Sequence, residues 1–289
     1  MAQKVTAPAI RARKVSNGAE PLVMVTAYDA PGARIADAAE VDIILVGDSL
    51  AMVVLGYDDT LSVTIDDMVH HTAAVARAQP SPLVVADMPW MSYHVSPDDT
   101  VRNAAALIRA GAQAVKLEGG RKRIPMVAAI IDAEVPVMGH IGLTPQSVHA
   151  MGGFKVQGKK ADAANLLVDD AVALADAGCF SIVLEGVPDA VARMVTEAVP
   201  VPTVGIGAGR WCDGQVLVFH DLLGFEDRIA PKFVRRYASL KSDAVAAMRT
   251  YADDVRAGRF PSDKESYHLA DEVKEVLGLY GSDGATKAV

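Results

Sequence analysis

Acidic side chains follow three successive apolar segments of the chain, at the point where each segment ends. These acids are Asp48, Asp87 and Glu118. If the segments are parallel strands, their carboxyl ends meet at one edge, where three like charges repel unless a cation neutralises them. Carboxylate oxygens, without thiolates or a histidine pair, favour a hard cation, with Mg²⁺ as the first choice. The pattern therefore predicts a metal-dependent enzyme.

Two further side chains could supply charge and proton chemistry beside these acids. Lys116 is two residues before Glu118 and so shares its face of the strand, where it could stabilise a substrate carboxylate or a developing enolate. Its alternative is a surface ion pair with Glu118, which so apolar a segment disfavours. Glu185 ends the apolar run 181–184, where burial could raise the pKa of its carboxyl group to suit a general base.

Each acid also has a purely structural interpretation, because a carboxylate that precedes a helix often caps it. For any single acid this alternative is at least as strong as the functional one. Asp29 fits a cap best, and Glu185 could cap the helix expected at 189–198. His140 follows the fifth apolar run and could bind substrate or satisfy a loop carbonyl; the sequence leaves both open, and the same holds for substrate contact by Tyr28.

Two glycine-rich segments add weaker signals. Residues 205–209 (Gly-Ile-Gly-Ala-Gly) follow a predicted strand and could approach a ligand closely, but they lack the context of a dinucleotide fingerprint. Residues 151–158 contain three glycines, and a mobile lid is the functional interpretation, with a plain surface loop as the alternative.

Eight β-rich runs alternate, for the most part, with amphipathic helical patterns. Their continuous apolar character is typical of parallel strands that are covered on both faces. A (β/α)8 TIM barrel is therefore predicted, with a doubly wound open sheet as the alternative. The connection 209–214 is too short for a full helix. The runs are 22–28, 43–47, 83–86, 114–117, 135–138, 181–184, 203–206 and 215–219, and the helices are expected at 66–78, 96–109, 160–177 and 189–198.

Bulk properties narrow the class of protein further. We expect one domain over 1–289, with an N-terminal arm (about 1–20), a closing helix at 239–259 and a loose tail (about 280–289). A net charge of −8 argues against a nucleic-acid partner, because proteins that bind nucleic acid typically carry clustered positive charge. The two cysteines support neither a disulfide framework nor a zinc site, and no segment has membrane-spanning character. A cytoplasmic protein is expected.

Motifs along nearly the whole chain are similar to those of one family. The segment Val46-Gly47-Asp48-Ser49-Leu50 and those around Lys116, His140 and Glu185 resemble the ketopantoate hydroxymethyltransferases, of the phosphoenolpyruvate mutase/isocitrate lyase barrel group. Any one motif is weak, but so many in order are specific. The matching segments are 26–29, 46–50, 71–75, 86–89, 115–120, 139–146, 153–158, 184–188, 205–209 and 260–261.

The resemblance implies a reaction and an assembly. A hydroxymethyl group would pass from 5,10-methylenetetrahydrofolate to 3-methyl-2-oxobutanoate through a Mg²⁺-stabilised enolate, with one Mg²⁺ per subunit. The product would be 2-dehydropantoate, in the first step of pantothenate biosynthesis. The resemblance also implies a cytoplasmic homodecamer. The folate has no signature of its own in the sequence.

The resemblance also implies roles for single residues. The metal ligands would be Asp48, Asp87 and Glu118, the 2-oxoacid contacts Asp48, Ser49, Asp87 and Lys116, and the proton acceptor Glu185. At Gly186, beside that acceptor, family members often carry cysteine, a difference that we do not expect to abolish the chemistry.

Two rival functions stay open. A carbon–carbon lyase of the isocitrate lyase group would use a similar magnesium and oxoacid site, but the Lys-Lys-Cys-Gly-His type of motif that carries its catalytic cysteine is absent. A non-catalytic, metal-binding barrel that serves as a scaffold is disfavoured by the acids at every expected strand end.

Overall fold

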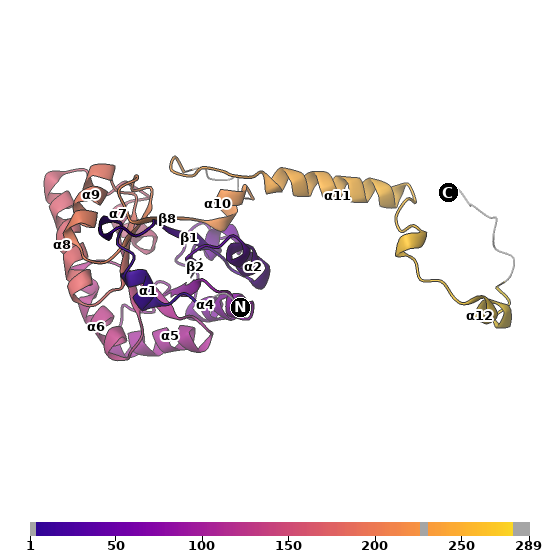
Figure 1. Ribbon diagram of the computed structural model, residues 1–289, viewed down its shortest axis with the longest axis horizontal. Coiled ribbons are helices and arrows are strands. Elements are labelled where there is room, and N and C mark those ends of the chain that lie inside the picture. Colours follow the sequence, from indigo (N-terminus) through magenta and orange to yellow (C-terminus); the bar gives the residue numbers. More distant parts are fainter. Residues whose placement is uncertain (1–3, 226–230, 280–289) are drawn as a thin grey trace. The chain divides into compact units, whose positions relative to one another are not determined.

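The computed structural model describes residues 4–225 and 231–279 of the chain. Eight parallel strands close into a barrel in sequence order, with β8 paired to β1, and helices surround them (Figure 1). The predicted TIM barrel is confirmed and the open-sheet alternative is wrong. The strands are β1 (Leu22–Thr26), β2 (Ile43–Val46), β3 (Leu83–Asp87), β4 (Ala114–Glu118), β5 (Val137–Gly142), β6 (Ser181–Glu185), β7 (Thr203–Ile206) and β8 (Gly214–Leu217).

The fifth strand differs from its prediction. It was expected at 135–138 but covers Val137–Gly142, so that His140 lies within the strand and not after it. The strand starts later because residues 134 and 135 still belong to the turn that ends the preceding helix. Glu134 has a positive φ there, and the Val135 amide donates to the Ile130 carbonyl. The shift places His140 opposite Glu118 in the sheet. Strands β1 and β8 also end two residues before the predicted positions.

Helices occupy most of the strand connections, and their starts have the expected caps. Thr64 forms a capping box with Asp67, and the Ser96 hydroxyl accepts from the Asp99 amide. The helices are α1 (Ala7–Arg11), α2 (Ala30–Ala38), α3 (Leu50–Val53), α4 (Ile65–Ala76), α5 (Pro97–Arg109), α6 (Ile124–Asp132), α7 (Val148–Met151), α8 (Ala161–Asp176), α9 (Asp189–Ala198) and α10 (Phe219–Leu223); short 3-10 turns are η1 (Val15–Asn17), η2 (Arg121–Arg123) and η3 (Pro145–Ser147).

The β7–β8 connection has no helix, as the sequence predicts. Within it, Gly209 has a φ of +76°, and a Cβ atom there would lie 2.4 Å from the Cβ of Asp189, at the start of α9. The glycine is thus required by close packing of the connection against α9. This contact accounts for a glycine in the 205–209 segment without invoking a ligand.

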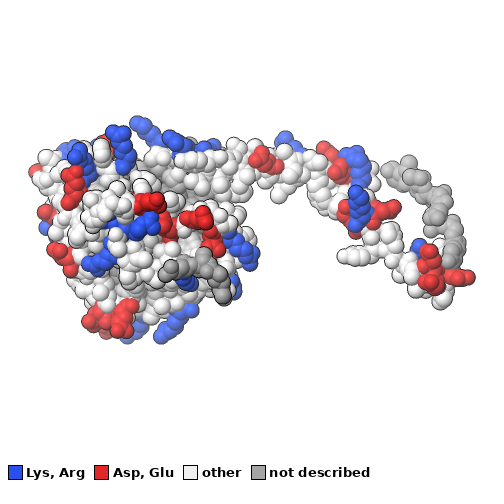
Figure 2. Space-filling view, in the orientation of Figure 1, with Lys and Arg blue, Asp and Glu red and all other residues white. Residues whose placement is uncertain are grey.

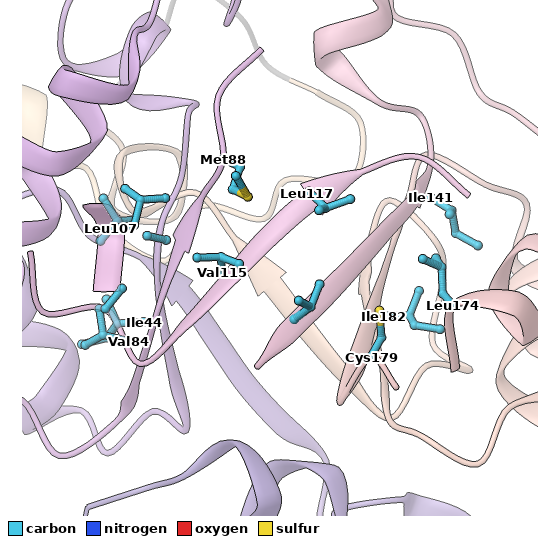
Figure 3. Packing of buried hydrophobic residues seen from close by; sticks show 14 of the residues in the cluster. Ile44, Val84, Met88, Leu107, Val115, Leu117, Ile141, Leu174, Cys179 and Ile182 are labelled. Carbon is cyan, nitrogen blue, oxygen red and sulfur yellow. The ribbon is translucent and has the colours of Figure 1, made fainter. Parts of the chain in front are cut away.

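Alternation along the strands divides the core into two layers. On β4, Val115 and Leu117 belong to the cluster between the strands and the helices, and Figure 3 shows them in that cluster. Ala114 belongs to the second cluster, on the other face of the sheet and hence inside the barrel. Because side chains alternate along a strand, Lys116 and Glu118 also face the interior.

Part of the N-terminal segment packs against the interior of the barrel. Ile10, on α1, is 1% exposed and joins the interior cluster. Farther along, the Lys14 ammonium is buried and forms an ion pair with Asp213 at 2.8 Å. It also donates to the carbonyls of Thr196 and Val201. The N-terminal arm over about 1–20 stays a prediction.

Residues 239–289 form a second compact unit, separate from the unit 1–238. Its described part contains α11 (Leu240–Arg256), η4 (Asp263–Glu265) and α12 (Asp271–Val276). The helix expected at 239–259 is confirmed as α11, although it ends three residues earlier. The tail expected at 280–289 lies outside the described residues, and the single domain over 1–289 stays a prediction.

The surface of the chain carries charges of both signs. On the face drawn in Figure 2, basic and acidic side chains are interspersed. Within residues 4–225 and 231–279, none of the helices has the length and apolar content needed to cross a bilayer. Both cysteines are free and buried.

The buried Lys14–Asp213 pair gives a first testable prediction. We expect Lys14→Met to lower the free energy of unfolding by about 3–5 kcal/mol, because Asp213 would keep its charge without the buried cation. Urea denaturation measures the difference. The exposed Lys4 supplies the control: Lys4→Met should change stability by less than about 0.5 kcal/mol. Equal effects of the two substitutions would contradict the assigned role.

Candidate active site

The predicted site residues meet at the carboxyl ends of the strands. Asp87, Glu118 and Glu185 are the last residues of β3, β4 and β6, and Asp48 follows β2 by two residues. The Asp48 amide donates to Asp87 Oδ2 at 3.0 Å, and this hydrogen bond connects Asp48 to Asp87. Asp48, Asp87 and Glu118 are each 5% exposed or less. This is the end of a TIM barrel at which active sites are built.

None of these four acids caps the helix that follows it. The caps of α5 and α9 are Ser96 and Pro188, and α3 begins without a side-chain cap. Asp29, by contrast, accepts from the Gly32 amide at 2.7 Å and caps α2, as the sequence predicts. The capping alternative is therefore correct for Asp29 and wrong for the acids inside the barrel mouth.

Lys116 is the buried cation in the midst of the acids. Its Nζ lies 2.8 Å from Asp87 Oδ1, the residue opposite it in the β3–β4 register, and forms a hydrogen bond of 3.2 Å with His140 Nδ1. A surface ion pair with Glu118 is not what the structure shows. Burial alone would lower the pKa of Lys116, but Asp87, Glu118 and Asp48 outweigh it and raise that pKa.

Repulsion among the acids is only partly relieved by this one ammonium group. Burial and the charge of Asp87 raise the pKa of Asp48 to about 7. Burial and the charge of Asp48 raise the pKa of Glu118 well above its ordinary range. A further positive charge at this place would favour the ionised form of both carboxyl groups.

His140 connects Lys116 to Glu185. Burial and the nearby Lys116 charge lower the pKa of His140, so the ring is neutral. An ammonium group can only donate, so His140 Nδ1 accepts and the ring proton is on Nε2. His140 Nε2 lies 3.2 Å from Glu185 Oε2, and burial raises the pKa of Glu185 to about 7. Glu185 is therefore poised to exchange a proton near neutral pH.

Tyr28 and Ser49 lie after β1 and β2, at the carboxyl ends of these strands. The Tyr28 hydroxyl and Ser49 Oγ are 2.9 Å apart, and His71 Nδ1 lies 2.7 Å from the Tyr28 carbonyl oxygen. Tyr28 is 4% exposed, and burial raises the pKa of its hydroxyl. Tyr28 therefore positions the Ser49 hydroxyl, whether or not it touches a substrate itself.

The sequence analysis assigns no role to two further residues of the site. Gln146 and Tyr93 are buried beside Asp48 and Glu118 and bond to each other at 2.5 Å. A glutamine after a proline in a turn, or a tyrosine in a loop, is common at surfaces, so neither residue type marks a site. Their contacts follow from the strand register, which brings the β3 and β5 loops together.

The strand-end carboxylates have the chemistry of ligands for a divalent cation. Among the described residues, no three His, Cys, Asp or Glu side chains form a preassembled metal cluster. The donor chemistry nevertheless fits Mg²⁺, which typically takes one or two carboxylates and completes its shell with water and substrate oxygens. Asp87 Oδ1 is buried and accepts no directed hydrogen bond from the described residues, although Lys116 lies beside it.

The glycine-rich segment 151–158 lies next to the site. Gly152 and Gly153 have positive φ angles, Phe154 is half exposed, and the Gln157 amide donates to the Gly186 carbonyl at 2.9 Å. This hydrogen bond ties the segment to the turn that follows Glu185. The lid interpretation stays a prediction.

Solved structures share the fold of this barrel. The chain is similar to 2,3-dimethylmalate lyase, described as a member of the PEP mutase/isocitrate lyase superfamily, at a TM-score of 0.57 and 20% identity over 96% of both chains. A phosphoenolpyruvate phosphomutase from Streptomyces platensis gives a TM-score of 0.59 at 16% identity, covering 95% of this chain and 96% of that chain. The fold is that of the PEP mutase/isocitrate lyase barrels.

Sequence comparison then gives the family. The model of the ketopantoate hydroxymethyltransferases matches residues 4–263. Curated relatives named 3-methyl-2-oxobutanoate hydroxymethyltransferase are 55% identical in Syntrophobacter fumaroxidans, over 96% of this chain and 99% of the relative, and 52% identical in Heliobacterium modesticaldum, over 97% and 100%. The chain belongs to the ketopantoate hydroxymethyltransferase family and is a transferase. The lyase and scaffold alternatives are not favoured.

Gly142 gives a prediction about the support of the site. It ends β5 opposite Glu185 with a φ of +97°, and a Cβ atom there would lie 2.3 Å from the Glu185 carbonyl oxygen. Gly153 has a φ of +110° but nothing within 4 Å of such an atom. Gly153→Ala should therefore cost about 1 kcal/mol of stability through φ alone, and Gly142→Ala about 2 kcal/mol more.

Thermal or urea unfolding of the two variants measures this difference. Gly142→Ala should also reduce turnover, because the displaced β5–β6 backbone carries Glu185. If both alanine variants lost the same stability, the close approach of the two strands would not be the reason for the glycine.

Proposed function

We propose that the protein transfers a hydroxymethyl group from 5,10-methylenetetrahydrofolate to 3-methyl-2-oxobutanoate and releases 2-dehydropantoate, in the first step of pantothenate biosynthesis. The observation that carries the proposal is the set of strand-end acids near Lys116, at the carboxyl mouth of a barrel of this family: Asp48, Asp87 and Glu118 are buried, and Glu185 is partly buried. A relative named for this activity matches 96% of the chain.

The oxoacid would bind between β2 and β4. Asp48, Ser49, Asp87 and Lys116 are the proposed contacts, with the Ser49 hydroxyl oriented by Tyr28. Asp48, Asp87 and Glu118 would hold one Mg²⁺ per subunit; when bound, the ion supplies a Lewis acid for the keto oxygen. The Lys116 ammonium, kept protonated by the acids around it, stabilises negative charge that develops on the same oxygen.

Glu185 would remove the proton from C3 of the oxoacid. Its raised pKa makes the carboxylate a stronger base than an exposed glutamate. The neutral His140 ring places Nε2 3.2 Å from Glu185 Oε2. The resulting carbanion equivalent would form a bond to the methylene carbon of the folate. Both C–N bonds of that carbon break, water supplies the hydroxyl oxygen, and the C3 proton and one proton of the water end on the two folate nitrogens. In this scheme the metal acids and the base are different residues.

The remaining assignments follow from the family. We propose a cytoplasmic homodecamer without nucleic acid or membrane partners, and a folate that approaches the oxoacid from the open mouth of the barrel.

A product assay tests the proposal. The full chain is incubated with 3-methyl-2-oxobutanoate, methylenetetrahydrofolate and Mg²⁺, and 2-dehydropantoate is quantified by mass spectrometry. We expect product with Mg²⁺, and its loss when EDTA removes the ion and its return when Mg²⁺ is restored, because the buried acids need the cation. Absence of product with Mg²⁺, Mn²⁺ and Co²⁺ alike would contradict the proposal.

The raised pKa of Glu185 predicts the pH dependence of the reaction. Only the carboxylate accepts a proton, and burial moves its pKa up to about 7. With Mg²⁺ saturating, kcat/KM should therefore rise about tenfold per pH unit below the pKa of Glu185, which the nearby cation moves downward from about 7, and level off above it. Initial rates on both sides of neutrality measure the profile. A rate that stays flat down to the ordinary range of a glutamate pKa would exclude Glu185 in this state as the base.

A further inference from the structure

Gln146 lies between two of the buried acids, and the proposed mechanism does not use it. Its Nε2 donates to Asp48 Oδ2 at 2.9 Å and to the Met88 carbonyl at 3.0 Å, and its backbone amide donates to Glu118 Oε2 at 3.0 Å. The residue is 6% exposed. One residue on η3 therefore holds one oxygen of each of two acids, which come from different strands.

Tyr93 fixes which way the amide of Gln146 points. The Tyr93 oxygen accepts the Glu118 amide at 3.3 Å, so its own proton goes to Gln146 Oε1 at 2.5 Å. The Met88 carbonyl can only accept, and so it requires the NH₂ group. The Tyr93 hydroxyl and the Met88 carbonyl therefore require the same orientation of the Gln146 amide, in which the NH₂ group faces Asp48.

The hydrogen bonds leave one oxygen of each acid for another partner. Asp48 and Glu118 are bound by Gln146 through Oδ2 and Oε2. Among the described residues no directed hydrogen bond reaches the second oxygen of either acid; Glu118 Oε1 lies 3.6 Å from His140 Nδ1. An acid that is anchored through one oxygen can rotate little, and its other oxygen has a defined direction.

We propose that Gln146 is a positioning residue for the divalent cation: it fixes the rotation of Asp48 and Glu118 so that each presents its second oxygen to the ion. The inference rests on the proposed function, which assigns these acids to the cation. Gln146 is not itself a ligand in this arrangement. Partners of this kind typically contribute a 10–100-fold factor to metal affinity.

Direct cation binding tests this role without any turnover. Mn²⁺ binding to the full chain is measured by electron paramagnetic resonance for the wild type and for Gln146→Met, which keeps the volume and removes the amide. We expect the dissociation constant to rise about 10–100-fold. Gln157→Met is the matched control, because the side chain of Gln157, on the same connection, donates to the Lys155 carbonyl at 2.8 Å and to no acid of the site among the described residues. Its affinity should equal that of the wild type.

Tyr93→Phe provides a second and milder variant. It removes the hydroxyl that orients the amide and leaves Gln146 in place, so Mn²⁺ affinity should fall in the same direction but by less. A merely structural role would lower the unfolding midpoint of the variants, followed by circular dichroism, and leave Mn²⁺ affinity of the folded protein unchanged.

The outcomes separate the inference from the proposed function. Wild-type affinity in folded Gln146→Met, or in Tyr93→Phe if the first variant does not fold, would overturn the positioning role while the cation site stands. Failure of the wild type to bind Mn²⁺ would overturn the cation site and the inference together. Binding that weakens in both variants and not in Gln157→Met supports the role.

Discussion

Burial of three carboxyl groups around one ammonium group is the constraint on which the site depends. Charges removed from water are costly unless they are compensated, and Lys116 compensates only part of the charge of Asp48, Asp87 and Glu118. The excess raises the pKa of Asp48 and Glu118. Replacing such groups by apolar side chains typically stabilises a protein, so the uncompensated negative charge supports the proposal that a cation binds here.

The barrel supplies the geometry that this electrostatic arrangement requires. Alternation along β4 sends Val115 and Leu117 outward to the helices and Lys116 inward to the acids. The register between β4 and β5 then sets His140 opposite Glu118, and β6 brings Glu185 to the other side of the imidazole ring. The same apolar layers that stabilise the fold therefore hold the polar groups in place.

Much of this could be predicted from the sequence, because strand ends are marked by local patterns. The eight strands, the Asp29 cap and the missing β7–β8 helix followed from apolar runs, cap residues and loop length. The position of β5 did not, because the left-handed Glu134 is not visible in composition. Gln146 was missed because its hydrogen bonds to Asp48 and Glu118 depend on tertiary contacts between loops, which no local pattern encodes.

The central claim is that cation binding and proton removal belong to different acids. The most direct measurement follows deuterium exchange at C3 of 3-methyl-2-oxobutanoate by proton NMR, without folate, in parallel with Mn²⁺ titration. For Glu185→Gln, the account predicts Mn²⁺ affinity equal to that of the wild type and exchange slower by about 100-fold or more. Exchange at the wild-type rate in that variant would contradict the account.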